Sequence, residues 1–244
     1  MNRLHLLRDA PASGWWNMAV DEWLLQTAAT RGVPVLRFYF WAEPTLSIGY
    51  FQHLADRAGH RASQGCPVVR RASGGGAIVH DRELTYSLAT PVRNRFSSTA
   101  ADFFYDLHRA LVDALCEWSV TATLCDPDHR DDAAFLCFQR RAPGDVVVAD
   151  SKIAGSAQRR SSGSILQHGS ILLTTSSSAP ELAGIDQTTG CKIDPHELSR
   201  CWCDGILDRW NATADEIAVT SEDTDAITSL GTARFASHTW TQRR

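Results

Sequence analysis

The chain has 244 residues, of which 43% are hydrophobic, so it is long enough to bury a substantial core. Its formal net charge of −4, with acidic and basic residues interspersed, argues against a nucleic-acid or membrane-surface partner selected by bulk charge. No apolar run is long enough to span a bilayer, residues 1–11 lack the apolar core of a signal peptide, and the seven cysteines lack the spacing of a disulfide framework. We therefore expect a cytoplasmic protein with reduced thiols.

The predicted elements alternate between helices and short strands. Apolar residues at helical spacing predict helices over Trp16–Thr30 and Ala100–Trp118. Runs rich in β-branched and aromatic residues, bounded by turn residues, predict strands over Val35–Phe40, Thr45–Phe51, Pro67–Arg71, Ala77–His80, Leu84–Thr90, Asp145–Val148, Lys152–Ala157 and Ser164–Leu173. A hairpin turn is expected at residues 149–151 and a polar loop at residues 126–132. The region from Pro195 onward is predicted to be mostly helical, with a polar link at Asn211–Asp215.

This order of elements is typical of an α+β fold, in which mixed sheets are flanked by helices. We expect a single domain over residues 1–244, in which residues 195–244 form a small helical C-terminal portion. Glu22 falls on the apolar stripe of the first predicted helix, where a buried carboxylate needs a partner. We expect it to form an ion pair with Arg37 or Arg71.

Three consecutive glycines follow one predicted strand, in Arg70-Arg71-Ala72-Ser73-Gly74-Gly75-Gly76-Ala77 with His80-Asp81 close behind. Glycines allow a positive φ and close approach of the backbone to a ligand, and their N–H groups can bind an anion. The arginines offer charge-assisted hydrogen bonds to a carboxylate, phosphate or thioester oxygen. The segment is neither a Walker A loop nor a dinucleotide-binding fingerprint. A tight hairpin with solvated arginines explains the glycines equally well.

Three other side chains could take part in catalysis or ligand binding. Lys152 begins the run Lys152-Ile153-Ala154-Gly155-Ser156-Ala157-Gln158, whose small residues leave room beside it. A lysine there can contact an acyl or phosphate oxygen, or favour the thiolate of a nearby cysteine. His168 and Gly169 interrupt an apolar strand, and Cys137 stands between two phenylalanines. Each also has a structural interpretation, as an exposed lysine at a hairpin tip, a hydrogen-bonded core histidine or a small buried thiol.

Together these segments resemble the lipoate-protein ligase and octanoyltransferase family, whose fold is shared with biotin–protein ligases. The resemblance extends over nearly the whole chain, and it is carried by Asn17–Glu22, Arg37-Phe38-Tyr39, Thr45–Gln52, the glycine run with His80-Asp81, Lys152–Gln158 and Leu166–Leu172. It implies that the acyl group and substrate are bound by Arg70, Arg71, Ser73, Gly74, Gly75, Gly76, Ala77, His80, Gly155, Ser156, Ala157, Gln158, His168 and Gly169.

The family resemblance leaves two reactions open. A transferase moves an octanoyl group from acyl carrier protein to the lysine of a lipoyl-carrier domain through a cysteine thioester, and it needs no cofactor. A ligase instead uses ATP and Mg to activate free lipoate as an acyl-adenylate. Cys137, followed by Pro143, an apolar strand and Lys152, resembles the transferase branch of Gram-positive bacteria. That resemblance implies that Cys137 carries the thioester and that Lys152 lowers the pKa of the Cys137 thiol.

Other features weigh on this choice. The Ser73–Ala77 segment is closer to the ligase form, and residues 139–144 lack the aromatic-acidic pattern usual in transferases. Single-chain ligases generally carry an extra C-terminal domain, and the roughly fifty residues of the predicted tail are too few for one. A separate accessory chain could supply it. We favour the transferase, with backbone N–H groups of Gly75–Ala77 or Ser156–Ala157 as oxyanion donors and a hydrophobic tunnel for the acyl chain behind the glycine run.

The expected partners are octanoyl-acyl carrier protein and a lipoyl-carrier domain, either a glycine-cleavage carrier protein or a 2-oxoacid dehydrogenase subunit, with neither nucleic acid nor membrane. A non-catalytic protein that binds lipoyl domains is a further alternative. In a third reading, Cys191, His196, Cys201 and Cys203 bind a metal in a scaffold protein, but their spacing matches structural zinc sites poorly. We expect buried thiols and no metal.

Overall fold

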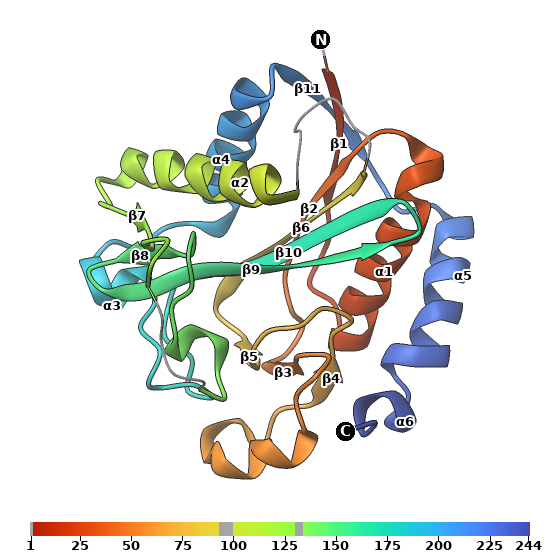
Figure 1. Ribbon diagram of the computed structural model, residues 1–244, viewed down its shortest axis with the longest axis horizontal. Helices are drawn as coiled ribbons and strands as arrows, with labels where there is room; N and C mark the ends of the chain where they lie inside the picture. The colour runs from red at the N-terminus through yellow and green to blue at the C-terminus, as the bar shows by residue number, and fades with distance from the viewer. Residues whose placement is uncertain (1, 93–99, 130–133) are drawn as a thin grey trace.

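The computed structural model describes residues 2–92, 100–129 and 134–244. Its centre is a mixed eight-stranded sheet with the order β11-β1-β2-β6-β10-β9-β8-β7, beside which lies a three-stranded sheet with the order β4-β3-β5 (Figure 1). The large sheet consists of β1 (Asn2–Arg8), β2 (Val35–Tyr39), β6 (Glu83–Pro91), β7 (Thr123–Leu124), β8 (Val146–Val148), β9 (Ser151–Ser161), β10 (Ser164–Leu172) and β11 (Ala212–Ile217). The small sheet consists of β3 (Thr45–Ile48), β4 (Val68–Arg70) and β5 (Ile78–His80).

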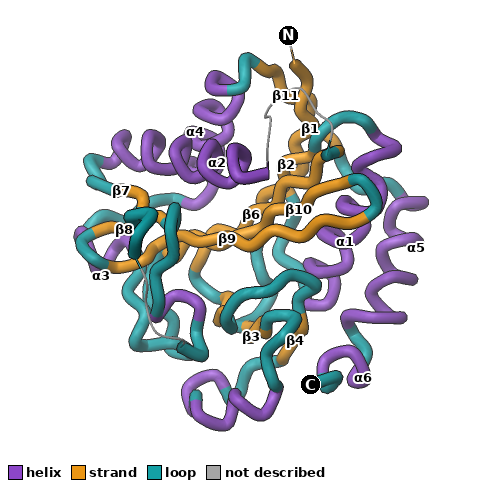
Figure 2. Tube along the Cα trace, viewed as in Figure 1, coloured by secondary structure: helices purple, strands orange, loops and turns teal. Residues whose placement is uncertain are grey.

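Helices cover both faces of the large sheet, as Figures 1 and 2 show. The helices are α1 (Gly14–Arg31), α2 (Ala100–Leu115), α3 (Ile185–Thr189), α4 (Pro195–Arg209), α5 (Ser221–Leu230) and α6 (His238–Thr241). The α2 and α4 helices cover one face, α1 and α5 lie on the other, and α6 packs against β4 of the small sheet. Consecutive strand residues point to opposite faces, so Leu6 packs in the core under α2 and α4, while Leu7 packs in the core under α1 and α5. The α+β architecture expected from the sequence is therefore confirmed.

The β9–β10 hairpin carries two of the motifs recognised in the sequence. Its antiparallel register places Gly169 opposite Ser156 and His168 opposite Ala157. The turn that leads into β9 consists of Ala149 and Asp150, with φ of 43° and 64°, which suits the tight hairpin predicted there. The hairpin thus brings the motif segments of β9 and β10 side by side, above the small sheet in Figure 1.

Two expectations about the C-terminal portion and its contacts are wrong. The link expected at Asn211–Asp215 belongs to β11, which pairs in parallel with β1, a strand that the local sequence pattern did not reveal. Glu22 is buried as expected, but it pairs with Arg234 at 2.8 Å and Arg159 at 3.5 Å. The reason is that α1 packs against the turn at Gly231–Phe235, which carries Arg234.

Two further expectations concern metals and membranes. Among the described residues, no group of three or more His, Cys, Asp or Glu side chains is arranged to hold a metal ion. Cys203 is buried, and this burial raises the pKa of its thiol to about 11. Within the same residues, no helix combines the length and apolar character needed to cross a membrane. The loop expected at 126–132 lies outside the described residues from residue 130 onward.

Candidate active site

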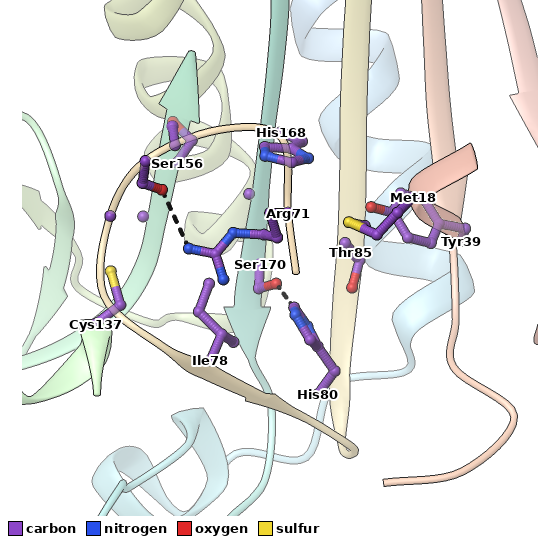
Figure 3. A pocket seen from close by; sticks show the side chains of 15 residues that line it. Met18, Tyr39, Arg71, Ile78, His80, Thr85, Cys137, Ser156, His168 and Ser170 are labelled. Atoms are coloured by element: carbon purple, nitrogen blue, oxygen red, sulfur yellow. Dashed lines mark hydrogen bonds between the residues drawn. The ribbon is translucent and has the colours of Figure 1, made fainter. Parts of the chain in front are cut away.

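A pocket lies between the glycine run, residue 137 and the β9–β10 hairpin (Figure 3). It is lined by Met18, Tyr39, Arg71, Gly74, Gly75, Ile78, His80, Thr85, Cys137, Gly155, Ser156, Ala157, His168, Gly169 and Ser170. Figure 3 shows Cys137 and Ser156 at one end, and Met18 with Tyr39 at the other. The fold thus gathers most of the predicted binding residues around one elongated space behind the glycine run.

A buried lysine lies beside the Cys137 thiol. Lys152 Nζ is 3.5 Å from Cys137 Sγ, 3.4 Å from the Cys137 carbonyl oxygen and 2.8 Å from Asp145 Oδ2. The side chains of Lys152 and Asp145 are each only 4% exposed. Burial lowers the pKa of Lys152, but the negative charges of Cys137 and Asp145 outweigh it, so the pKa lies above its ordinary value. Lys152 therefore stays an ammonium, and its nitrogen lies next to the Cys137 sulfur.

Asp145 belongs to the candidate site through its ion pair with Lys152, although it was not among the residues expected from the sequence. It follows Gly144 in a loop, and its other carboxylate contact is the N–H of Ala142 at 2.7 Å, which anchors it before β8. No motif marks it, because its importance comes from the ion pair with Lys152 across a bulged strand pair. The sequence marks Asp145 only weakly, as an acidic residue shortly before an apolar strand that leads to Lys152.

Gly155 provides the space that this ion pair occupies. A Cβ at residue 155 would lie 2.5 Å from Lys152 Cε, 2.8 Å from Lys152 Nζ and 2.9 Å from Asp145 Oδ1. Contacts under 3.0 Å force the lysine to move, so a side chain here and the observed position of the ammonium exclude each other. Glycine at residue 155 is therefore a requirement of the ion pair in its observed position.

We expect Gly155→Ala to slow alkylation of Cys137 by iodoacetamide about ten-fold, because the displaced ammonium no longer stabilises the thiolate. The rate is measured by peptide mass spectrometry, which separates Cys137 from the other six cysteines among the seven. The matched control is Gly59→Ala, since a Cβ at residue 59 meets nothing within 4 Å. Equal alkylation rates in the two variants would contradict the proposed effect of the ammonium.

The glycine run positions Cys137. The Ala77 N–H donates to the Phe135 carbonyl at 2.8 Å, and the Cys137 N–H donates to the Ala77 carbonyl at 2.7 Å. A Cβ at Gly76 would lie 2.9 Å from the Cys137 nitrogen, so only glycine allows this approach. Gly75 has φ of +96°, a left-handed conformation that favours glycine. Gly76 and Ala77 thus hold the cysteine instead of lining the pocket, and the Ala77 N–H expected as an oxyanion donor is already used.

Arg71 holds the shape of the same run from inside. Its buried guanidinium donates to the carbonyl oxygens of Ser47 at 2.9 Å, Gly74 at 3.2 Å and Gly76 at 2.8 Å. Burial lowers the pKa of Arg71 to about 10, and the side chain still lines the pocket. His80 lies below it, hydrogen-bonded to Ser47 Oγ at 2.6 Å, with its ring stacked on Trp41 at 3.8 Å between centroids.

His168 connects the pocket to a buried charge cluster. Its Nε2 contacts Ser73 Oγ of the glycine run, and its Nδ1 lies 2.9 Å from Asp21 Oδ2. Asp21 in turn pairs with Arg37 at 2.8 Å. Ser73 therefore supports the pocket through His168 and does not line it.

Two predicted binding residues lie away from the pocket. Arg70 donates to the carbonyl oxygens of Gly49 at 3.0 Å, Gln52 at 2.7 Å and Thr241 at 2.8 Å, so it ties the C-terminal segment to a loop. The Gln158 amide donates to Gln167 Oε1 at 2.8 Å and does not line the pocket either. Both side chains belong to motif segments, but neither lines the space that the motifs enclose.

Residues 13–189 match the family described as lipoyl protein ligase A/B catalytic domain. The chain belongs to this family. The family resemblance found in the sequence is thus confirmed, and the lipoyl protein ligase A/B match ends before α4.

Relatives in the lipoyl protein ligase A/B family carry a transferase name. A protein named octanoyltransferase LipM from Carboxydothermus hydrogenoformans is 36% identical over 165 residues, which cover 66% of this chain and 61% of the relative. The chain therefore spans less than two thirds of that relative's length. The octanoyltransferase LipM of Kyrpidia tusciae is 34% identical over 237 residues, 91% of this chain and 80% of the relative.

The fold is also that of a solved lipoate protein ligase. The Thermoplasma acidophilum protein with bound lipoic acid superposes with a TM-score of 0.80 at 21% identity, covering 100% of this chain and 99% of that chain. At this identity the likeness concerns the fold alone.

Proposed function

We propose that this chain transfers an octanoyl group from an acyl thioester donor to the lysine of a lipoyl-carrier domain, through a thioester on Cys137. The observation that carries the proposal is the Cys137 thiol at one end of an elongated pocket, 3.5 Å from the ammonium of Lys152. The names of the relatives, octanoyltransferase LipM, support the same reaction.

In the first half-reaction, the Cys137 thiolate attacks the donor carbonyl carbon. A C–S bond forms to Cys137, the bond to the donor sulfur breaks, and the electron pair leaves on that sulfur. Gly75 lines the pocket, and within the described residues its N–H group has no hydrogen-bond acceptor, so it is the candidate donor to the oxyanion. In the second half-reaction, the acceptor lysine amine attacks the same carbon and Cys137 leaves.

The acyl chain would occupy the pocket between Cys137 and Met18. Each methylene group transferred from water to such a pocket contributes about 0.8 kcal/mol to binding. Its binding therefore depends on apolar contact more than on the few polar groups there, which instead hold the glycine run in place. The proposed donor is octanoyl-acyl carrier protein, and the proposed acceptor is a glycine-cleavage carrier protein or a 2-oxoacid dehydrogenase subunit.

The proposed reaction uses no ATP, Mg or other cofactor, because the donor is already an activated thioester. An ATP-dependent ligase would need no nucleophilic cysteine, and Cys137 would then serve packing alone. The two readings differ in whether an acyl group becomes attached to the enzyme in the absence of ATP.

Intact-protein mass spectrometry separates these readings. Incubation with octanoyl-acyl carrier protein without ATP should give wild-type protein an octanoyl adduct that hydroxylamine removes, and Cys137→Ala should give none. A matched control is Cys66→Ala, since Cys66 is also without a disulfide but belongs to the core of the small sheet. No adduct on wild type, with transfer to a lipoyl domain only when ATP and free acid are added, would establish the ligase instead.

A further inference from the structure

A buried histidine lies directly behind the Cys137 end of the pocket. His108, on α2, is 0% exposed, and its Nδ1 is 2.6 Å from the Gly144 carbonyl oxygen. A carbonyl oxygen can only accept, so Nδ1 carries the proton and Nε2 has a free lone pair. That Nε2 is 3.1 Å from Ser156 Oγ, and Ser156 lines the pocket. The Ser156 hydroxyl therefore donates to His108.

The orientation of the Ser156 hydroxyl is set from a second side. Gln167 Nε2 donates to Ser156 Oγ at 3.2 Å and to the Tyr86 hydroxyl at 2.9 Å. Tyr86 itself lies 3.4 Å from His108 Nε2, a longer contact than that of Ser156. With an N–H pointing at its oxygen, the Ser156 hydroxyl keeps its own proton directed at His108.

The proposed second half-reaction needs a group that takes a proton from the attacking amine. Lys152 is not suited, because its ion pair with Asp145 holds it as an ammonium. The two histidines that line the pocket have both ring nitrogens in hydrogen bonds. His80 contacts Ser47 and Glu83, and His168 contacts Ser73 and Asp21. Ser170 also lines the pocket, but its hydroxyl donates to Glu83 at 2.9 Å and lies 3.5 Å from His80 Nδ1, a nitrogen that Glu83 already contacts. The Ser156 hydroxyl, in contrast, lies 3.1 Å from His108 Nε2, and no carboxylate among the described residues contacts that nitrogen.

We propose that Ser156 and His108 form a proton relay for transfer of the acyl group to the acceptor lysine. As the amine nitrogen forms its bond to the thioester carbon, its N–H proton passes to Ser156 Oγ, while the Ser156 proton passes to His108 Nε2. The C–S bond then breaks, and the electron pair stays on Cys137 Sγ. His108 becomes an imidazolium and later returns its proton to water. The inference rests on the proposed function, and it assigns a role to two residues within it.

The surroundings of His108 suit a base. Burial lowers the pKa of His108, and the positive charge of Lys152 acts in the same direction, whereas the Gly144 carbonyl and Asp145 oppose them. The imidazole is consequently neutral and ready to accept a proton near neutral pH. The Phe104 ring also packs against His108, at 4.4 Å between centroids, and it carries no charge.

The relay predicts an asymmetry between the two half-reactions. Thiolate attack on the donor thioester takes no proton from the substrate, whereas amine attack does. In His108→Gln and Ser156→Ala, transfer of the octanoyl group to a lipoyl domain should therefore slow by about 10²-fold, and by about ten-fold or more beyond any slowing of octanoyl-enzyme formation.

The experiment follows each half-reaction by single-turnover mass spectrometry, with Trp202→Phe as the control. The Trp202 indole donates to the Leu107 carbonyl at 2.8 Å, so this variant disturbs α2 beside His108 without touching the pocket. Unchanged transfer to the lipoyl domain in the two relay variants would overturn the relay. It would also be overturned if the two half-reactions slowed equally in those variants, with the same slowing in Trp202→Phe. Failure of wild type to form the thioester would overturn the proposed function, and the relay with it.

Discussion

Lys152→Met should lower the rate of octanoyl-enzyme formation by about 10- to 1,000-fold, because the thiolate loses the ammonium 3.5 Å away. It should also lower the free energy of unfolding by about 3–5 kcal/mol, since Asp145 is left as a buried carboxylate without its cation. Urea unfolding and mass spectrometry of the acyl-enzyme measure the two effects separately.

The double variant Lys152→Met with Asp145→Asn separates stability from chemistry. An asparagine at 145 is uncharged and can still accept the Ala142 N–H, so most of the lost unfolding free energy should return. The rate of acyl-enzyme formation should stay as low as in the single variant. If the double variant recovers both stability and rate, Lys152 acts by holding the fold and not through its charge.

Arg37→Met should lower the free energy of unfolding by about 3–5 kcal/mol. Arg37 is 0% exposed and bridges Asp9 at 2.6 Å and Asp21 at 2.8 Å, so its loss removes the cation from the buried Asp21 and from the partly exposed Asp9. The matched control is Arg3→Met, because Arg3 forms a short but exposed pair with Asp215. That control should cost less than about 1 kcal/mol in urea unfolding. Similar losses of unfolding free energy in Arg37→Met and Arg3→Met would mean that burial does not determine how much these ion pairs stabilise the protein.

The same cluster predicts how this difference changes with pH. Burial raises the pKa of Asp21, but His168, Arg37 and Ser87 outweigh it, so the pKa lies below its ordinary value of 3.8. A carboxyl with a lowered folded pKa stabilises the protein above its unfolded pKa, and this contribution is lost as the pH falls through the folded pKa. The gap in unfolding free energy between wild type and Arg37→Met should therefore narrow below pH 3.8.

The cluster also reaches the candidate site. Asp21 holds His168, and His168 contacts Ser73 beside the three glycines. A variant that frees Asp21 from Arg37 is therefore expected to loosen the glycine run as well as the core.

Much of the fold was predictable from local patterns. The hairpin turn at residues 149–151, the strands on either side of it and the helix over Ala100–Leu115 follow from turn residues and from periods of two or 3.6. Part of the site was predictable for a similar reason. Gly76 and Gly155 lie where a close approach of neighbouring atoms requires glycine, and Lys152 carries a charge, so the residue type at each position indicates its role.

Other features depended on contacts between distant segments. Local propensity could not reveal that β1 pairs with β11, that Glu22 meets Arg234, or that Asp145 neutralises Lys152. His108 resembles any polar residue within an amphipathic helix until α2 packs on β9 and brings it to Ser156. The chain thus specified its elements and its reactive residue types locally, whereas the packing of distant elements decided which charges are buried together, since burial and pairing are properties of the assembled core.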